Sequence, residues 1–337
     1  MSQFRPTIRD VWAARKRIAP IVKRTPLIYS NRLSEIAEAS VYLKLENMHD
    51  IGAFKVRGAA NKILSLSPEE QKRGVSTFST GNHGQAVAYV AQKLGIKAVV
   101  CISNRVPKAK VDAIRRWGAQ LEIVGESQDA AGEHCFRLQR EHGLTVIPPF
   151  DDPHIIAGQG TIGLEILEEL PEVDMVIGGL SGGGLHAGVG LALKSNDPDI
   201  QVIGVSMEHG AVMHESLKEG RPVVLEERDT LADSLLGGIG LDNQYTLPMV
   251  RDYVDQSILI SEETIAEGMA YMLETHRMVV EGAAAVGIGA LLRGKISKPG
   301  GHIAIIISGC NVDLHAHLQA TQSFIGKFSK KETNALL

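Results

Sequence analysis

The chain has 337 residues, which is more than one hydrophobic core usually supports, so we expect two domains. Apolar residues make up 44% of the sequence and charged residues 22%, a composition typical of a soluble globular enzyme. The net charge of -4 leaves no basic surplus for binding nucleic acid, and no apolar stretch is long enough to predict a membrane span.

The N-terminal segment predicts a capped amphipathic helix. Thr7 and Asp10 form an N-terminal capping signal, and Val11, Ala14 and Ile18 recur at helical spacing. The segment lacks the apolar core of a signal peptide, although its arginines leave a transit peptide as an alternative. The three cysteines are widely spaced without metal-type pairing, so we expect a reducing, cytoplasmic environment.

Short β-branched runs alternate with helical segments through the rest of the chain. The helical segments 84–94 and 108–117 end before Gly95 and Gly118, where helix C-caps belong. The alternation predicts an α/β fold with mostly parallel sheets. The expected strands are residues 41–45, 75–78, 98–102, 121–124, 145–147, 175–177, 201–205 and 303–307.

The spacing of the runs between residues 75 and 145 is typical of a compact set of βα units. Pro148-Pro149 and Asp151-Asp152-Pro153 follow these units and suggest a domain boundary. We therefore predict a large domain of residues 1–77 and 150–337 and a small mobile domain of residues 78–149.

A glycine-rich turn follows the apolar run 175–177 and opens a helical segment. It reads Gly179-Leu180-Ser181-Gly182-Gly183-Gly184-Leu185. Small residues let the backbone approach an oxyanion, and a helix N-terminus favours negative charge, so this loop predicts a phosphate site. The spacing of Gly182, Gly184 and Ala187, with Glu208 after the next strand, also half-fits a dinucleotide fingerprint. An NAD-binding oxidoreductase is therefore an alternative of a different class.

Four further motifs accompany this loop. They are Ala53-Phe54-Lys55-Val56-Arg57-Gly58-Ala59, Ser79-Thr80-Gly81-Asn82-His83-Gly84-Gln85, Ala157-Gly158-Gln159-Gly160-Thr161 and Ser308-Gly309-Cys310-Asn311-Val312-Asp313. In this order, over about residues 5 to 325, the chain resembles the serine/threonine dehydratase family of fold type II pyridoxal-phosphate (PLP) enzymes. It looks most like the subgroup with hydroxyectoine-utilisation dehydratases and 3-hydroxyaspartate or phenylserine dehydratases. The resemblance implies two open, twisted, mostly parallel α/β domains with the cofactor between them, held chiefly by the large domain.

The resemblance also implies the cofactor contacts. Lys55 would form the Schiff base and then transfer the substrate proton, as a primary amine can. Phe54 would pack beside the ring, Asn82 would bond the ring hydroxyl oxygen, and Ser308 would face the ring nitrogen. Because a hydroxyl does not keep that nitrogen protonated, elimination is favoured over transamination. The phosphate would lie on the glycine loop, at Ser181, Gly182, Gly183, Gly184 and Leu185. Without the family pattern, Lys55 would be a surface lysine, Asn82 an N-cap and Ser308 the end of a strand.

The substrate contacts implied by the resemblance come mainly from the second motif. Backbone N-H groups of Ser79, Thr80, Gly81 and His83 would hold the substrate carboxylate, while the His83 imidazole is expected to have a structural role. Glu281 would lie near the substrate side chain, or else cap the helix that follows it.

The reaction implied is loss of water from a β-hydroxy-L-amino acid, followed by release of a 2-oxo acid and ammonia. The protein would be a carbon-nitrogen lyase of amino-acid catabolism, acting as a homodimer. Ile51 and Ala53 replace the small hydroxyl residues usual before the cofactor lysine. The substrate therefore stays open among serine, threonine, 3-hydroxyaspartate, phenylserine and a hydroxyectoine-derived amino acid.

Three further alternatives stay open. Thr80 stands where racemases of the family carry serine, so an amino-acid racemase with side dehydratase activity is an alternative. A β-replacement synthase is a rival within the fold, although such relatives usually carry threonine at the position of His83. Glu208 matches one divalent-cation ligand of some relatives, but His214 stands where an acidic ligand is expected. A cation is therefore left open.

Overall fold

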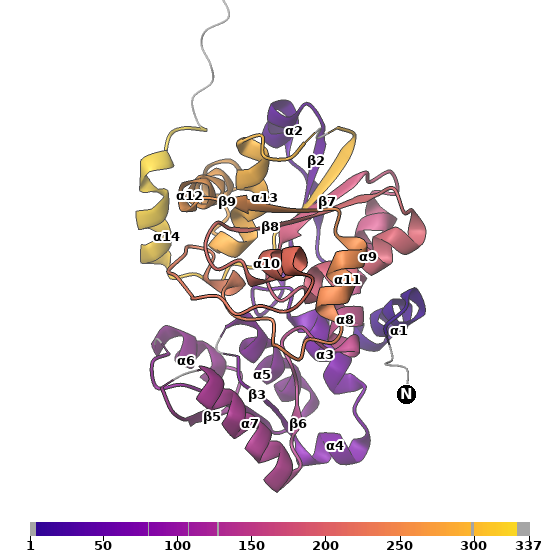
Figure 1. Cartoon of the computed structure of the whole chain (residues 1–337), viewed down its shortest axis with the longest axis vertical. Coiled ribbons are helices and arrows are strands. Elements are labelled where there is room, and N and C mark those ends of the chain that lie inside the picture. Colours follow the sequence, from indigo (N-terminus) through magenta and orange to yellow (C-terminus); the bar gives the residue numbers. More distant parts are fainter. Residues whose placement is uncertain (1–4, 80, 107, 127, 298–299, 329–337) are drawn as a thin grey trace, which may run out of the picture.

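The computed structural model describes residues 5–79, 81–106, 108–126, 128–297 and 300–328, folded as an α/β protein with two sheets (Figure 1). The strands are β1 (Leu27–Tyr29), β2 (Ser40–Lys44), β3 (Val75–Thr77), β4 (Ala98–Ile102), β5 (Gln120–Ile123), β6 (Thr145–Val146), β7 (Met175–Gly179), β8 (Gln201–Met207), β9 (Gln256–Ile260) and β10 (His302–Ile306). The α-helices are α1 (Ile8–Ile18), α2 (Asn31–Ala37), α3 (Val56–Leu64), α4 (Pro68–Arg73), α5 (Asn82–Leu94), α6 (Lys108–Arg115), α7 (Gln128–His142), α8 (Pro153–Glu169), α9 (Gly184–Asn196), α10 (Val212–Glu219), α11 (Thr246–Tyr253), α12 (Glu262–Tyr271), α13 (Gly282–Leu292) and α14 (Leu314–Thr321).

The larger sheet has six strands in the order β1-β2-β10-β7-β8-β9, and only β1 runs antiparallel to its neighbour. The smaller sheet has the order β5-β4-β3-β6 and is parallel throughout. In Figure 1 the larger sheet lies in the upper part of the molecule, and the smaller sheet lies below it with α5, α6 and α7. The predicted α/β class with mostly parallel sheets is therefore confirmed. The sequence analysis missed β1 and β9.

The smaller sheet includes residues on both sides of one predicted boundary. The predicted large domain included residues up to 77, but Val75 of β3 pairs with Ala98 of β4 and with Thr145 of β6. A division by sheets would therefore start the smaller domain before Val75. One apolar core, with Ile63 of α3 and Val87 of α5, packs helices of both sides together, and the division into two domains stays a prediction.

The N-terminal helix forms as its sequence predicts. The backbone N-H of Thr7 donates to the Asp10 carboxylate at 2.8 Å, and Val11, Ala14 and Ile18 are buried. Such a cap satisfies donors that the first helical turn leaves unpaired. Among the residues described, no helix is long and apolar enough to cross a membrane.

The glycines of the motif 157–161 let three helices pack closely. A Cβ atom on Gly158 of α8 would lie 2.7 Å from the Arg57 carbonyl oxygen of α3. One on Gly160 would lie 2.8 Å from the Gly188 carbonyl oxygen of α9. Because these spaces admit only hydrogen, the motif fixes the first turn of α3, and with it the preceding Lys55, against α8.

Candidate active site

Three adjacent strands of the larger sheet end at the same edge. The parallel strands β2, β10 and β7 are neighbours. Their carboxyl ends lead to residues 51–55, here called the lysine segment, to Ser308 and to the glycine loop. Ligands of open α/β sheets bind outside the carboxyl ends of the strands. The topology thus brings together three sites that lie far apart in the sequence.

Backbone pairing joins the lysine segment to the end of β10. The Phe54 N-H donates to the Ser308 carbonyl oxygen at 3.0 Å, and the Cys310 N-H donates to the Gly52 carbonyl oxygen at 2.9 Å. Ala53 and Gly309 form an antiparallel bridge between these contacts. Ser308 is therefore buried directly beside the segment that carries Lys55.

Lys55 lies just before α3 with a partly buried side chain. Its Nζ donates to the Pro149 carbonyl oxygen at 2.9 Å and lies 5.2 Å from the centre of the Phe54 ring. Burial lowers the pKa of Lys55 to about 8, although the negative charge of Glu281 opposes this shift. A lysine that loses its proton near neutral pH can act as a nucleophile and as a base.

The glycine loop connects β7 to the N-terminus of α9. Gly183 has φ +85°, a conformation that favours glycine, and precedes the first residue of the helix. A Cβ atom there would lie 2.7 Å from Met213 Cε and 2.8 Å from Val250 Cγ2, while one on Gly182 would overlap the Phe150 ring. The loop therefore needs glycine, and it places a helix N-terminus at the same edge as Lys55. These features fit a bound phosphate group.

Asn82, Glu281 and Asn311 form a hydrogen-bonded group between α5 and the segment before α13. Asn82 Nδ2 donates to the two Glu281 carboxylate oxygens at 3.0 and 3.1 Å. Asn82 Oδ1 accepts from Asn311 Nδ2 at 2.7 Å, and Asn311 also donates to the Ile51 carbonyl oxygen at 2.8 Å. Gly81, rather than Asn82, is the N-cap of α5, so the capping alternative for Asn82 is wrong.

Glu281 is a buried carboxylate with amide partners. Burial raises its pKa to about 7, and the negative charge of Asp233 adds to the shift, while the Asn82 amide opposes it. The Glu281 side chain makes no capping hydrogen bond to α13. A carboxyl group that titrates near neutral pH can accept or donate a proton at the site.

The His83 imidazole is held by a backbone group. It is buried, and its Nε2 lies 3.0 Å from the Ile147 carbonyl oxygen, so this nitrogen carries the proton and donates. Burial lowers the pKa of His83 to about 3, with a further contribution from the charge of Lys55. The neutral, anchored ring agrees with the expected structural role.

The other residues expected to hold the substrate carboxylate surround the start of α5. Thr80 lies outside the described residues. Ser79 is half-buried, and its carbonyl oxygen lies where a Cβ atom on Gly84 would overlap it, so glycine is required at position 84. Gly81 precedes the first helical residue, which places its segment at a helix N-terminus.

The residues considered for a divalent cation do not form a ligand set. Glu208 is exposed after β8, and His214 Nδ1 lies 2.8 Å from the Ser257 hydroxyl. Within the described part of the chain, no group of three or more His, Cys, Asp or Glu residues could hold a metal ion.

The structure adds contacts that the sequence analysis missed. Pro149 provides the carbonyl oxygen for Lys55, Phe150 packs against Gly182, and Asn311 orients Asn82. The sequence around Pro149 and Phe150 predicts a domain boundary, and a backbone acceptor leaves no signal in side-chain chemistry. Asn311 belongs to the motif 308–313, but its residue type alone predicts no role.

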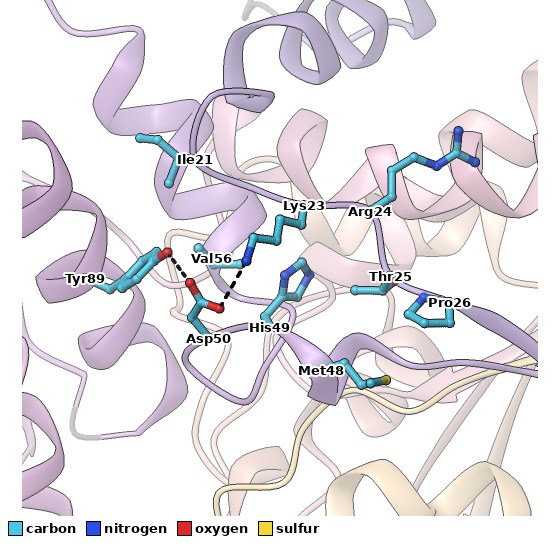
Figure 2. A pocket seen from close by; sticks show the side chains of 10 residues that line it. All are labelled: Ile21, Lys23, Arg24, Thr25, Pro26, Met48, His49, Asp50, Val56 and Tyr89. Atoms are coloured by element: carbon cyan, nitrogen blue, oxygen red, sulfur yellow. Dashed lines mark hydrogen bonds and ion pairs between the residues drawn. The ribbon is translucent and has the colours of Figure 1, made fainter.

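A cavity of about 190 Å³ is lined in part by Val56, the residue after Lys55 (Figure 2). Its lining residues are Ile21, Lys23, Arg24, Thr25, Pro26, Met48, His49, Asp50, Val56 and Tyr89. The Tyr89 hydroxyl donates to Asp50 at 2.7 Å, and Lys23 Nζ lies 3.9 Å from the same carboxylate. None of these residues is among the predicted site residues.

Comparisons with known proteins agree with the geometry. A protein of Sinorhizobium fredii (strain NBRC 101917 / NGR234), named provisionally as a threonine dehydratase, is 47% identical over 319 residues, 95% of this chain and 96% of that protein. The L-threonine ammonia-lyase of Thermotoga maritima is 43% identical over 309 residues, 92% of this chain and 76% of that protein. The structure of maize serine racemase superposes with a TM-score of 0.89 at 34% identity, covering 97% of this chain and 100% of that chain.

The family model described as pyridoxal-phosphate dependent enzyme matches residues 18–309. This match includes Lys55, Asn82, the glycine loop and Ser308, so it accounts for residues that a dinucleotide site would leave unexplained. The expected family, fold class and cofactor are confirmed. The chain belongs to the family of pyridoxal-phosphate dependent enzymes.

Proposed function

We propose that this protein is an ammonia-lyase that removes water from a β-hydroxy-L-amino acid and yields a 2-oxo acid and ammonia. The observation that carries the proposal is the meeting of Lys55, Ser308 and the glycine loop at the ends of adjacent strands. Relatives named as threonine dehydratase and L-threonine ammonia-lyase support the reaction class.

The residues of this edge fit the cofactor that the family implies. When bound, PLP supplies an aldehyde for the substrate amine and an electron-withdrawing ring that acidifies the Cα proton. The glycine loop and the N-terminus of α9 would hold the phosphate, and Ser308 would face the ring nitrogen. The Asn82 amide would donate to the ring hydroxyl oxygen. Lys55 would hold the aldehyde until substrate displaces it.

Lys55 would then carry the proton transfer. With a pKa lowered to about 8, its free amine can take the Cα proton near neutral pH and becomes an ammonium group. The electrons of the Cα-H bond form the Cα=Cβ double bond, the β-hydroxyl departs with the Cβ-O electron pair, and the proton returned from Lys55 completes a water molecule. The released enamine tautomerises and is hydrolysed to the 2-oxo acid and ammonia, so no external oxidant or reductant is needed.

Threonine is the first substrate to test, because two relatives carry threonine in their names. Serine is the second, because the fold matches that of maize serine racemase. The lysine segment contains buried Ile51 and Ala53, so it provides no side-chain hydroxyl at these two positions. The experiment measures ammonia release from L-threonine, L-serine, 3-hydroxyaspartate and phenylserine. We expect the wild type to release ammonia from at least one of these amino acids, and Lys55→Ala to release none. A panel without release above the variant would contradict the proposal.

Racemisation is the second candidate, because the structure resembles maize serine racemase along nearly the whole chain. The hydroxyl residue expected to serve the opposite face, Thr80, lies outside the described residues. Chiral chromatography of L-serine reactions separates the two activities. D-serine formed faster than ammonia would make racemisation the principal reaction.

We also propose that the protein is a homodimer in the cytoplasm. Light scattering tests the homodimer, and cell fractionation tests the location.

A further inference from the structure

Three consecutive residues of the segment between β6 and α8 reach different parts of the site. The Pro149 carbonyl oxygen accepts from Lys55, and the Phe150 ring packs against Gly182. The Asp151 side chain turns to the start of α11. A single short segment therefore links the lysine, the glycine loop and α11.

The Asp151 carboxylate caps α11 from a distant part of the chain. Its Oδ1 accepts the backbone N-H groups of Tyr245 at 2.9 Å and Thr246 at 2.8 Å, and its Oδ2 accepts the Gln244 N-H at 2.8 Å. The Tyr245 and Thr246 groups are donors that the start of α11 leaves without intrahelical partners. Asp151 thereby fixes the position of α11 relative to Phe150.

Helix α11 in turn packs against the glycine loop. A Cβ atom on Gly183 would lie 2.8 Å from Val250 Cγ2 and 3.2 Å from Thr246 Cβ. Phe150 packs against the same loop, because a Cβ atom on Gly184 would lie 3.0 Å from the Phe150 Cβ. The loop is thus held between Phe150 and α11, and Asp151 joins these two contacts.

We infer that Asp151 is a positioning residue for the cofactor phosphate, acting through α11 on the backbone of the glycine loop. This inference rests on the proposed assignment of the loop as the phosphate site. Anion binding by backbone N-H groups depends on the direction of these groups. If α11 loses its cap and can move, the glycine loop should bind the phosphate group less tightly. The aldehyde chemistry at Lys55 should be spared.

The test compares two aldehydes that differ only in the phosphate. Dissociation constants of PLP and of pyridoxal are measured by absorbance titration of the apoprotein, for the wild type, Asp151→Ala and Asp151→Asn. The wild type should bind PLP more tightly. The ratio of the pyridoxal to the PLP constant should fall about tenfold in Asp151→Ala and about threefold in Asp151→Asn, with pyridoxal affinity unchanged.

Ser261→Ala is the matched control, because Ser261 caps α12 by accepting the Thr264 N-H at 3.3 Å. It should lower the unfolding midpoint and leave the ratio unchanged. If Asp151→Ala does not fold, Asp151→Asn carries the test. An unchanged ratio, or an equal loss for both aldehydes, overturns the role of Asp151. A wild type without preference for PLP would instead overturn the glycine loop as the phosphate site.

Discussion

Two buried polar clusters flank the start of α3, and only one is fully charge-compensated. Arg57 Nε and Nη2 donate to Glu46 at 2.7 and 2.8 Å, and Nη1 and Nη2 donate to Glu165 at 2.6 and 2.9 Å. Lys44 adds an ion pair with Glu165 at 2.8 Å. Despite burial, the guanidinium lowers the pKa of Glu46 and the carboxylates raise the pKa of Arg57, so both stay charged.

The second cluster contains Lys55, two residues before Arg57, together with Glu281 and Asn82. Lys55 donates to a neutral carbonyl oxygen, and Glu281 accepts from the Asn82 amide. Burial moves the two pKa values toward each other, to about 8 for Lys55 and about 7 for Glu281. The comparison teaches that direct pairing holds protons in place at Arg57, whereas buried groups with neutral partners can exchange protons near neutral pH.

The largest expected effect is on activity, when the lysine of the second cluster is replaced. Lys55→Ala should reduce ammonia release at least about 10³-fold, because it removes the nucleophile and the base together. The free energy of unfolding should not fall, since the lost amine is paired with a neutral oxygen. Steady-state assays and urea denaturation of the same preparation measure both. Substantial turnover in the variant would remove Lys55 from the mechanism.

Arg57→Ala should show the opposite pattern. Removing the guanidinium leaves Glu46 as a buried charge without its main partner and Glu165 with Lys44 alone, so the free energy of unfolding should fall by about 3–5 kcal/mol in urea denaturation. Arg105→Ala is the control, because its pair with Glu126 is exposed and should be worth about 1 kcal/mol or less. Equal losses in both variants would show that the Arg57 cluster is not compensated as described.

Glu281→Gln tests the second cluster through pH. The pKa of a glutamate side chain is 4.5 without the fold's influence, and the fold raises that of Glu281 to about 7. The folded state therefore holds this proton more tightly than the unfolded state. The stability from this group is therefore greatest below pH 4.5 and is lost as pH rises to about 7. In the wild type this loss amounts to up to about 3 kcal/mol of the free energy of unfolding, and the Gln variant should not show it. Identical pH dependence of unfolding in the two proteins would contradict the raised pKa.

The smallest expected effect concerns the glycine loop. Gly183→Ala combines a strained φ of +85° with contacts to Met213 and Val250, and should weaken PLP binding about tenfold. Gly95→Ala is its control, because Gly95 has φ +67° with open space around it. Titration of both apoproteins gives the comparison. A similar loss in the control would assign the effect to backbone strain rather than to the site.

The sequence predicted the fold best where local pattern and burial agree. Strand β4 matches its predicted bounds, residues 98–102, because all its residues are apolar and buried. Strand β9 was missed because Gln256 and Ser257 begin it and most of it is only half-buried. Strand β1 has three residues, too few for an alternating pattern to show.

The site was predictable only where chemistry sits in contiguous motifs. Motif order predicts Lys55, Asn82 and Ser308 as site residues, and the structure brings the segment with Lys55 beside Ser308. In contrast, the bond from Lys55 to the Pro149 carbonyl and the cap that Asp151 makes on α11 join residues more than ninety positions apart. Such contacts depend on tertiary packing and have no periodicity along the chain.

The most direct test of the central claim locates the covalent attachment of the cofactor. The purified holoenzyme is reduced with borohydride, digested and analysed by peptide mass spectrometry. The account predicts a pyridoxyl-phosphate adduct on the peptide that contains Lys55, and none in Lys55→Ala. An adduct on a different lysine, or a holoenzyme without any adduct, would contradict it.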